Sequence, residues 1–424
     1  MSEIALDCKL ARNYTMEDVP DALSYLLIRL VPSSSVDFGS LPVNLGLVID
    51  VSGSMRGQKI KNAKQAAKYV VNALKPVDTV SVIVFSDEAR AIVPATKVTD
   101  KFPILATIDK ISIVGGTRMY HGLEAGAREI HRGSTPNSIN RIIALTDGET
   151  EGEEQCLTIA RQEAQNNLVI TAFGIGNEYN EEFLKEIADT TLGSFYHLQT
   201  PEQISTEFSR ELSATSAAVI SNVKLSINVA KDVRLEEMHR IYPTTVKLLP
   251  DIDADGKIAS VPVGNLRKDE QTIFGAQLRL PARSGGRVRV AQVFASYSVP
   301  SLQLEDKVEK SDIIVQYTKD RDLCGRADKE VISYFNQLTV QSLIEKAVGE
   351  TRTGNLSVAT EALNQAQLLT QRVGNIPLTR SIETARQELT EKGTISPGLI
   401  KTVRAGGGHT VRIDQEEVEE EAED

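Results

Sequence analysis

The stretch that most constrains the fold of this chain is residues 45–55, which read Leu-Gly-Leu-Val-Ile-Asp-Val-Ser-Gly-Ser-Met. Its apolar first half predicts a strand that is buried on both faces, as in the middle of a parallel sheet. Three small oxygen-bearing side chains follow at alternating positions: Asp50, Ser52 and Ser54. Open α/β sheets bind ligands in the loops that leave such strands. Gly53 removes steric conflict from this loop, so its side chains can surround a small hard cation.

The region around this stretch alternates between strand and helix patterns, from about residue 41 to residue 215. Further apolar strand candidates lie at residues 80–85, 141–146 and 168–175. Amphipathic helical stripes separate them. Such alternation predicts a doubly wound parallel α/β sheet. Residues 91–98 contain Pro94 and fit an edge strand of that sheet.

Two later segments extend the pattern begun by residues 45–55. Residues 115–117 read Gly-Gly-Thr, and residues 145–149 read Leu-Thr-Asp-Gly-Glu directly after a strand candidate. Together the three segments resemble the metal-ion-dependent adhesion site of von Willebrand factor A (vWA) domains, in the multi-domain form found in bacteria. All five family positions are matched, by Asp50, Ser52, Ser54, Thr117 and Asp147. The resemblance covers roughly two fifths of the chain and implies a Rossmann-like vWA fold for residues 41–215.

The resemblance implies that these five residues bind Mg²⁺ or Mn²⁺. Mg²⁺ takes six oxygen ligands in near-octahedral geometry, and three hydroxyls with two carboxylates supply most of that shell. In the family, a carboxylate from a partner protein fills the last position. Two protein carboxylates leave a divalent ion receptive to such an anionic ligand. The competing interpretation is that Asp50, Ser52 and Thr117 only cap turns and helix starts.

Two further features allow more than one interpretation. Arg118, next to Thr117, can pair with an incoming carboxylate or be an exposed residue at a helix start. Residues 251–258 resemble the first eight positions of an EF-hand loop. However, Pro262 stands where the bidentate Glu belongs, and no helix pattern flanks the segment. We therefore expect a hairpin turn there and treat Ca²⁺ binding as the alternative.

The rest of the chain divides into four parts. Residues 1–40 hold two strand signals, and residues 216–325 show strand alternation with turn signals, which predicts a β-sandwich. In bacterial proteins that resemble this one, the vWA domain is often inserted between early and late strands of one sandwich, so residues 1–40 are expected to pair with the later block. Residues 326–395 predict three short helices packed as a bundle or cap. Residues 396–424, with Gly406–Gly408 and an acidic run, predict a flexible tail.

Charge and cysteine content limit the class of protein. The formal charge is -11, but residues 414–424 hold eight acidic side chains and no basic one, so the remainder is nearly neutral. A nearly neutral body argues against a nucleic-acid partner. The three cysteines, Cys8, Cys156 and Cys324, lie far apart and indicate reduced thiols. With no secretory signal and no membrane-spanning run visible, we expect a cytoplasmic protein with no membrane partner.

Enzyme signatures are missing from the sequence. It contains no phosphate-binding loop and no HExxH, and the histidines are scattered without ligand spacing. We therefore expect a non-enzymatic, Mg²⁺-dependent interaction or scaffold protein that binds an Asp or Glu of a protein partner. One alternative, which the resemblance suggests, is an accessory subunit of an ATP-driven chaperone-like or chelatase machine. Another is a metal-dependent phosphohydrolase.

The acidic tail generates one more hypothesis. Residues 414–424 carry many carboxylates, and the predicted metal site accepts one. With Gly406–Gly408 as a hinge, the tail can compete weakly with the true partner for the metal. The alternative is a solvated tail that aids solubility.

Overall fold

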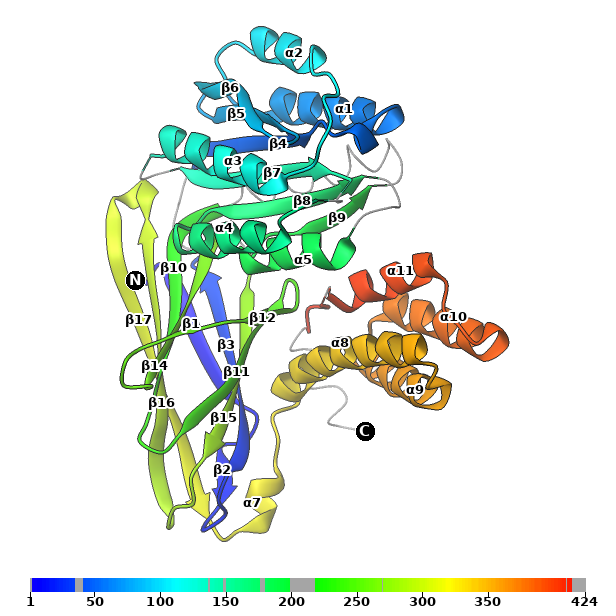
Figure 1. The fold of residues 1–424 in the computed structure, drawn as a ribbon. Helices are drawn as coiled ribbons and strands as arrows, with labels where there is room; N and C mark the ends of the chain where they lie inside the picture. The colour runs from blue at the N-terminus through cyan, green and yellow to red at the C-terminus, as the bar shows by residue number, and fades with distance from the viewer. Residues whose placement is uncertain are drawn as a thin grey trace.

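The computed structural model describes residues 2–34, 41–135, 138–147, 150–175, 180–198, 218–268, 270–408 and 410–413. These residues form three β-sheets and a group of helices at the C-terminal end (Figure 1). The acidic run at residues 414–424 lies outside the described residues. The hypothesis that this tail competes for the metal therefore stays a prediction. In the described part of the chain, no helix combines the length and apolar character needed to cross a membrane.

The first sheet has six strands in the order β6-β5-β4-β7-β8-β9. Their bounds are β4 Val43–Asp50, β5 Thr79–Phe85, β6 Ala89–Lys97, β7 Ile139–Thr146, β8 Val169–Ile175 and β9 Phe195–Leu198. Five of the strands are parallel, but the edge strand β6 runs antiparallel to β5. The sheet is therefore mixed and not wholly parallel as predicted, because the short β5–β6 connection forms a hairpin and a parallel pair needs a long crossover.

Helices cover both faces of this sheet. Their bounds are α1 Gln58–Ala73, α2 Phe102–Asp109, α3 Met119–Gly133, α4 Glu153–Gln165 and α5 Glu181–Thr190. One core joins α1 and α2 to the side chains of Leu45, Leu47 and Ile49, and a second core joins α3, α4 and α5 to Val48. The alternation of β4 side chains between two apolar layers explains its unbroken hydrophobic sequence.

Two further sheets form a second body, here called the two-sheet unit. One has the strand order β1-β3-β15-β11-β12 and the other β13-β14-β10-β16-β17-β2. The strands of the sheet that contains β1 are β1 Ile4–Leu10, β3 Ala22–Pro32, β11 Arg234–Tyr242, β12 Val246–Leu248 and β15 Thr272–Leu280. The strands of the sheet that contains β2 are β2 Tyr14–Met16, β10 Ala218–Val229, β13 Asp251–Ile252, β14 Ile258–Arg267, β16 Gly286–Val299 and β17 Leu304–Thr318.

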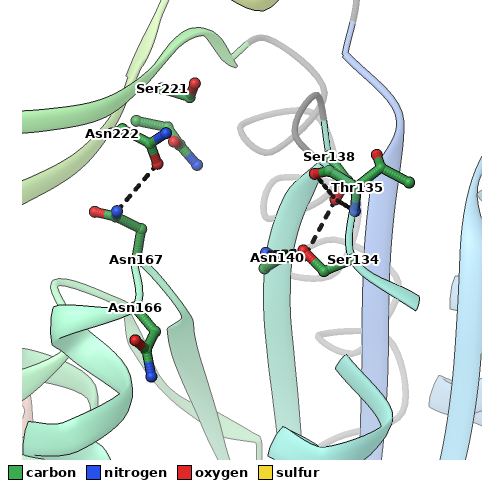
Figure 2. A pocket seen from close by; sticks show the side chains of 9 residues that line it. Ser134, Thr135, Ser138, Asn140, Asn166, Asn167, Ser221 and Asn222 are labelled. Atoms are coloured by element: carbon green, nitrogen blue, oxygen red, sulfur yellow. Dashed lines mark hydrogen bonds between the residues drawn. The ribbon is translucent and has the colours of Figure 1, made fainter. Parts of the chain in front are cut away.

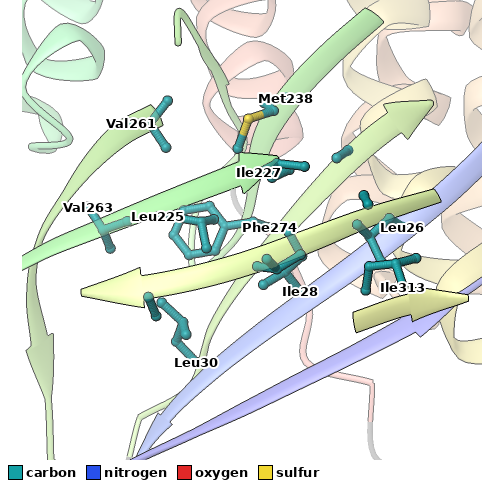
Figure 3. Packing of buried hydrophobic residues seen from close by; sticks show 14 of the residues in the cluster. Leu26, Ile28, Leu30, Leu225, Ile227, Met238, Val261, Val263, Phe274 and Ile313 are labelled. Carbon is teal, nitrogen blue, oxygen red and sulfur yellow. The ribbon is translucent and has the colours of Figure 1, made fainter. Parts of the chain in front are cut away.

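The N-terminal strands are an integral part of the two-sheet unit. β3 pairs with β15 over nine residues, from Ala22 opposite Leu280 to Leu30 opposite Thr272. Side chains from both sheets share one hydrophobic core, in which Ile28 and Phe274 face Leu225 and Val263 (Figure 3). The first sheet of the molecule is thus inserted between two strands of the two-sheet unit, β3 and β10.

The C-terminal helices form a third body, here called the helical unit. It consists of α8 Lys329–Thr353, α9 Leu356–Arg372, α10 Ile376–Lys392 and α11 Pro397–Gly408, preceded by the short helix α7 Arg321–Gly325. A single core runs through α8 to α11. Capping explains the breaks, since α8 and α10 each end at a glycine in the left-handed conformation, Gly354 and Gly393.

The predicted start of a flexible tail at residue 396 is wrong. Residues 397–408 form α11, and its Val403 is buried in the core of the helical unit. The glycines that suggested a hinge instead permit close packing. A Cβ atom on Gly406 would lie 3.0 Å from Leu378, and one on Gly407 would lie 2.8 Å from Ile344. The helical unit therefore has four packed helices where the sequence predicted three.

Polar contacts join the inserted sheet to its neighbours. Arg404 of α11 donates to Glu182 of α5 at 2.9 Å and to Glu345 of α8 at 2.7 Å. At the opposite end of the sheet, Asn167 donates to Asn222 of β10 at 3.0 Å, on one side of a cavity of about 340 Å³ lined by serine, threonine and asparagine (Figure 2). These contacts are polar, and Leu192, between α5 and β9, adds an apolar contact with the core of the two-sheet unit.

The shared core leads to a prediction for Ile28, which is fully buried on β3. Ile28→Ala should lower the free energy of unfolding by about 2–5 kcal/mol, because it leaves a cavity between the two sheets. Leu23, on the same strand but 36% exposed, provides the matched control. Leu23→Ala should cost under about 1 kcal/mol. Urea denaturation of both variants measures the difference, and equal losses would contradict the assignment of the core.

The insertion leads to a second prediction. The fully buried members of both cores around the first sheet fall between Val43 and Ile187. A fragment of residues 41–215 should therefore fold alone and unfold in one cooperative transition. Circular dichroism during thermal unfolding tests this. A fragment that binds a hydrophobic dye and melts without cooperativity would mean that the contacts with the neighbouring units are needed for folding.

Candidate metal centre

Two buried carboxylates meet at the carboxyl edge of the first sheet. Asp50 is the last residue of β4, and Asp147 directly follows β7. β4 and β7 are parallel neighbours, with Ile49 opposite Leu145. Because parallel strands end at the same edge, the pairing brings both aspartates together. Asp50 is 0% and Asp147 1% exposed.

Ser52 and Ser54 connect the two carboxylates. The backbone N–H of Ser52 donates to Asp50 Oδ1 at 2.8 Å, and Ser52 Oγ lies 2.9 Å from Ser54 Oγ. Ser54 Oγ in turn donates to Asp147 Oδ1 at 3.0 Å. The structure therefore brings together four of the five residues that the sequence singled out.

The loop that carries the serines is anchored at both ends. The Val51 N–H donates to the carbonyl of Phe85 at 2.9 Å, which extends the β4–β5 ladder into the loop. Gly53–Met55 then form a single 3₁₀ turn whose Met55 side chain is fully buried. Ser54 is exposed beside it. The cluster consequently has a rigid floor and one side open to solvent.

Burial changes the acidity of Asp50. It raises the pKa of this carboxyl to about 6, although hydrogen bonds from Thr146 and Ser52 act in the opposite direction. The neighbouring Asp147 raises it further through like-charge repulsion. The site therefore disfavours its own negative charge, and a cation in contact with Asp50 would relieve that cost.

The structure joins Thr117 to residues 150 and 151 through its backbone. Its carbonyl accepts hydrogen bonds from the N–H of Glu151 at 3.0 Å and from Thr150 Oγ1 at 3.2 Å. The loop of Thr117 thus packs on the loop that follows Asp147. Among the described residues, no hydrogen bond links the Thr117 hydroxyl to the other four candidates. Its role as a ligand remains a prediction.

Two residues of the cluster were missed from the sequence. Thr146 Oγ1 donates to Asp50 Oδ2 at 2.7 Å, and Lys59 Nζ donates to Asp147 Oδ2 at 2.9 Å. Thr146 directly precedes Asp147, so its position in the motif was a usable signal. Lys59 lies on α1, and only the tertiary packing of that helix brings its side chain to Asp147.

The two sequence features that allowed more than one interpretation, Arg118 and residues 251–258, make their contacts outside the Asp50–Asp147 cluster. Arg118 is half-buried and donates to Glu151 at 3.3 Å. In the EF-hand-like stretch, Asp253 Oδ1 accepts from the N–H groups of Lys257 and Ile258 at 2.7 and 2.8 Å. This carboxylate closes the turn between β13 and β14, as the hairpin interpretation expected.

The donor set of the cluster suits a hard divalent cation. Two carboxylates and two hydroxyls are oxygen ligands of the kind that Mg²⁺ and Mn²⁺ prefer. The described residues contain no group of three or more His, Cys, Asp or Glu side chains arranged for a metal. A metal at this cluster therefore depends on the serine hydroxyls as well as on Asp50 and Asp147.

Comparisons with known proteins agree with this architecture. Residues 44–210 match the von Willebrand factor type A domain model. The chain is 28% identical over 266 residues to the uncharacterised protein sll0103 of Synechocystis, which covers 62% of this chain and 63% of that protein. It is 29% identical over 217 residues to inter-alpha-trypsin inhibitor heavy chain H2 of Mus musculus, covering 48% of this chain and 23% of that one. The chain thus spans less than two thirds of either relative.

Solved structures extend the similarity beyond the matched domain. A von Willebrand factor type A protein from Catenulispora acidiphila superposes with a TM-score of 0.82 and 19% identity, covering 97% of each chain. The ArnB paralog VWA2 from Sulfolobus acidocaldarius gives a TM-score of 0.59 and 17% identity over 96% of this chain and 100% of that one. At such identities the similarity concerns the fold.

Proteins with this domain commonly mediate protein–protein interactions. The first sheet with its flanking helices, the family match and the bacterial relatives all agree with the resemblance drawn from the sequence. Residues 44–210 of this chain therefore carry a von Willebrand factor type A domain.

Proposed function

We propose that this protein is a non-enzymatic, cytoplasmic interaction or scaffold protein that binds an acidic residue of a protein partner through a divalent metal ion. The observation that carries the proposal is the chain of contacts from Asp50 through Ser52 and Ser54 to Asp147, at one edge of a rigid sheet. When bound there, Mg²⁺ or Mn²⁺ supplies a coordination position for an oxygen from outside the protein.

The charges of the cluster support an acidic partner. Asp50 and Asp147 together carry two negative charges, which a divalent ion balances without excess. The loaded site would therefore carry no excess negative charge to repel a carboxylate. A divalent ion with an open coordination position attracts a carboxylate and disfavours a cationic or apolar group. Ser54 lies on the exposed side of the cluster, where such a carboxylate can approach.

The hydrogen-bond partners of the serines support a binding role over catalysis. The hydroxyls of Ser52 and Ser54 contact each other, and Ser54 donates to the Asp147 carboxylate. A nucleophilic serine is activated by a base such as histidine within hydrogen-bond reach. Here the serine oxygens are instead grouped with carboxylates, which is the arrangement that a hard cation needs.

The metal-binding part of the proposal predicts the effect of Asp147→Ala. This substitution should weaken Mg²⁺ binding by more than roughly tenfold, since even outer-shell changes at metal sites cost about 10- to 100-fold. Glu151→Ala is the matched control, because it removes the same charge from a nearby exposed position. Titration calorimetry with Mg²⁺ measures both. Equal affinities for the wild type and Asp147→Ala would overturn the metal site.

The partner-binding part predicts that capture depends on the metal. Full-length protein used as bait in Mg²⁺ should retain a partner that is released by EDTA. Asp147→Ala bait should fail to retain the same partner, whereas Glu151→Ala bait should retain it. Mass spectrometry identifies the bound proteins. Recovery of one set of proteins under all four conditions would contradict binding through the metal.

A further inference from the structure

Lys59 occupies an unusual place in the cluster. Its Nζ lies 2.9 Å from Asp147 Oδ2, and its side chain is 28% exposed while that of Asp147 is 1% exposed. Ser54 already donates to the other oxygen of the same carboxylate. Both oxygens of Asp147 are therefore engaged by groups of this chain, and one of these groups is a cation.

The position of Lys59 does not favour the helix that carries it. α1 begins at Gln58, and its first turn contains Lys59 and Lys61 but no acidic residue. The amino end of a helix carries partial positive charge, so lysines there are unfavourable by themselves. The contact with Asp147 offsets this cost for Lys59. Lys61 is exposed to solvent in the same turn.

A divalent ion that coordinated Asp147 Oδ2 would share that oxygen with Lys59. Mg²⁺ coordinates oxygen at about 2.1 Å, so an ion on Asp147 Oδ2 would lie within roughly 5 Å of a lysine that stayed in place. Two cations on one buried carboxylate oxygen repel each other strongly, because low exposure weakens screening by water and salt. One of them has to move, and only the lysine has a flexible four-carbon stem.

We propose that Lys59 is a built-in competitor of the metal: its ammonium pairs with Asp147 in the metal-free protein and withdraws when a divalent cation binds. The inference rests on the proposed function, because it presumes that the cluster binds Mg²⁺. Lys59 stabilises the buried Asp147 carboxylate without a metal and raises the Mg²⁺ concentration at which the site fills. The protein therefore remains folded and poorly receptive to an acidic partner until Mg²⁺ is sufficient.

The first test uses the unmodified protein. An amine-reactive acetylating reagent should modify Lys59 slowly in EDTA, since the amine contacts Asp147 and is partly covered there, and faster in saturating Mg²⁺. Lys61 serves as the internal reference and should react equally in both. Tandem mass spectrometry separates the two positions. If calorimetry shows bound Mg²⁺ while the labelling rate of Lys59 stays constant, the lysine does not withdraw and the inference is wrong.

The second test removes the competing charge. Lys59→Met should tighten Mg²⁺ binding by roughly tenfold or more, as expected for deleting a unit charge close to a divalent ion. It should also melt at a lower temperature in EDTA, so that the gain in melting temperature on adding Mg²⁺ is larger than in the wild type. Lys59→Arg retains the charge and should keep nearly the wild-type affinity. Lys61→Met controls for charge and should change neither quantity.

The outcomes separate the inference from the proposed function. If neither the wild type nor Lys59→Met binds Mg²⁺, the metal site itself is wrong. If the wild type binds Mg²⁺ and Lys59→Met binds it equally or more weakly, Lys59 supports the site instead of competing for it, and only the inference fails. Should Lys59→Met not fold, the labelling test and the affinity of Lys59→Arg still decide the matter.

Discussion

The burial of β4 on both faces is the constraint on which the rest of the structure depends. All eight of its residues are buried, and their side chains alternate between two separate cores. A slip of one residue would exchange the two apolar layers, so the register of β4 with β5 and β7 is strongly specified. That register in turn determines where Asp50 lies and why Asp147 is next to it. The hydrophobic packing of β4 therefore brings the acidic side chains of Asp50 and Asp147 together in one buried site.

Such a concentration of buried charge has to be balanced by the surrounding groups. Thr146, Ser52 and Ser54 donate hydrogen bonds to the two carboxylates, and Lys59 supplies a positive charge. Losing one partner of a buried charge is costly, because the remaining charge is left without compensation. The polar cluster is therefore a structural element as well as a candidate binding site, and its two roles draw on the same oxygens.

The parts that could be predicted from the sequence share a physical property. Asp50, Ser52, Ser54 and Asp147 follow apolar strands, and their chemistry is visible in the motif itself. Lys59 could not be assigned, since the direction of a long side chain on a helix depends on what the helix packs against. Residues 397–408 were misjudged for a related reason. Three glycines predict a break from local propensity alone, but close approach to Leu378 and Ile344 favours residues without a Cβ atom.

The pairing of β3 with β15 also sets an order of events during synthesis. Leu30 emerges from the ribosome long before its partner Thr272. At typical elongation rates of 5–20 residues per second, the roughly 240 residues between them take tens of seconds to synthesise. During that interval the inserted domain can complete its own cores, while the apolar face and open edge of β3 have no native partner. An inserted domain that folds alone, as predicted above, would then be complete while β1 and β3 are still exposed to aggregation or chaperone binding.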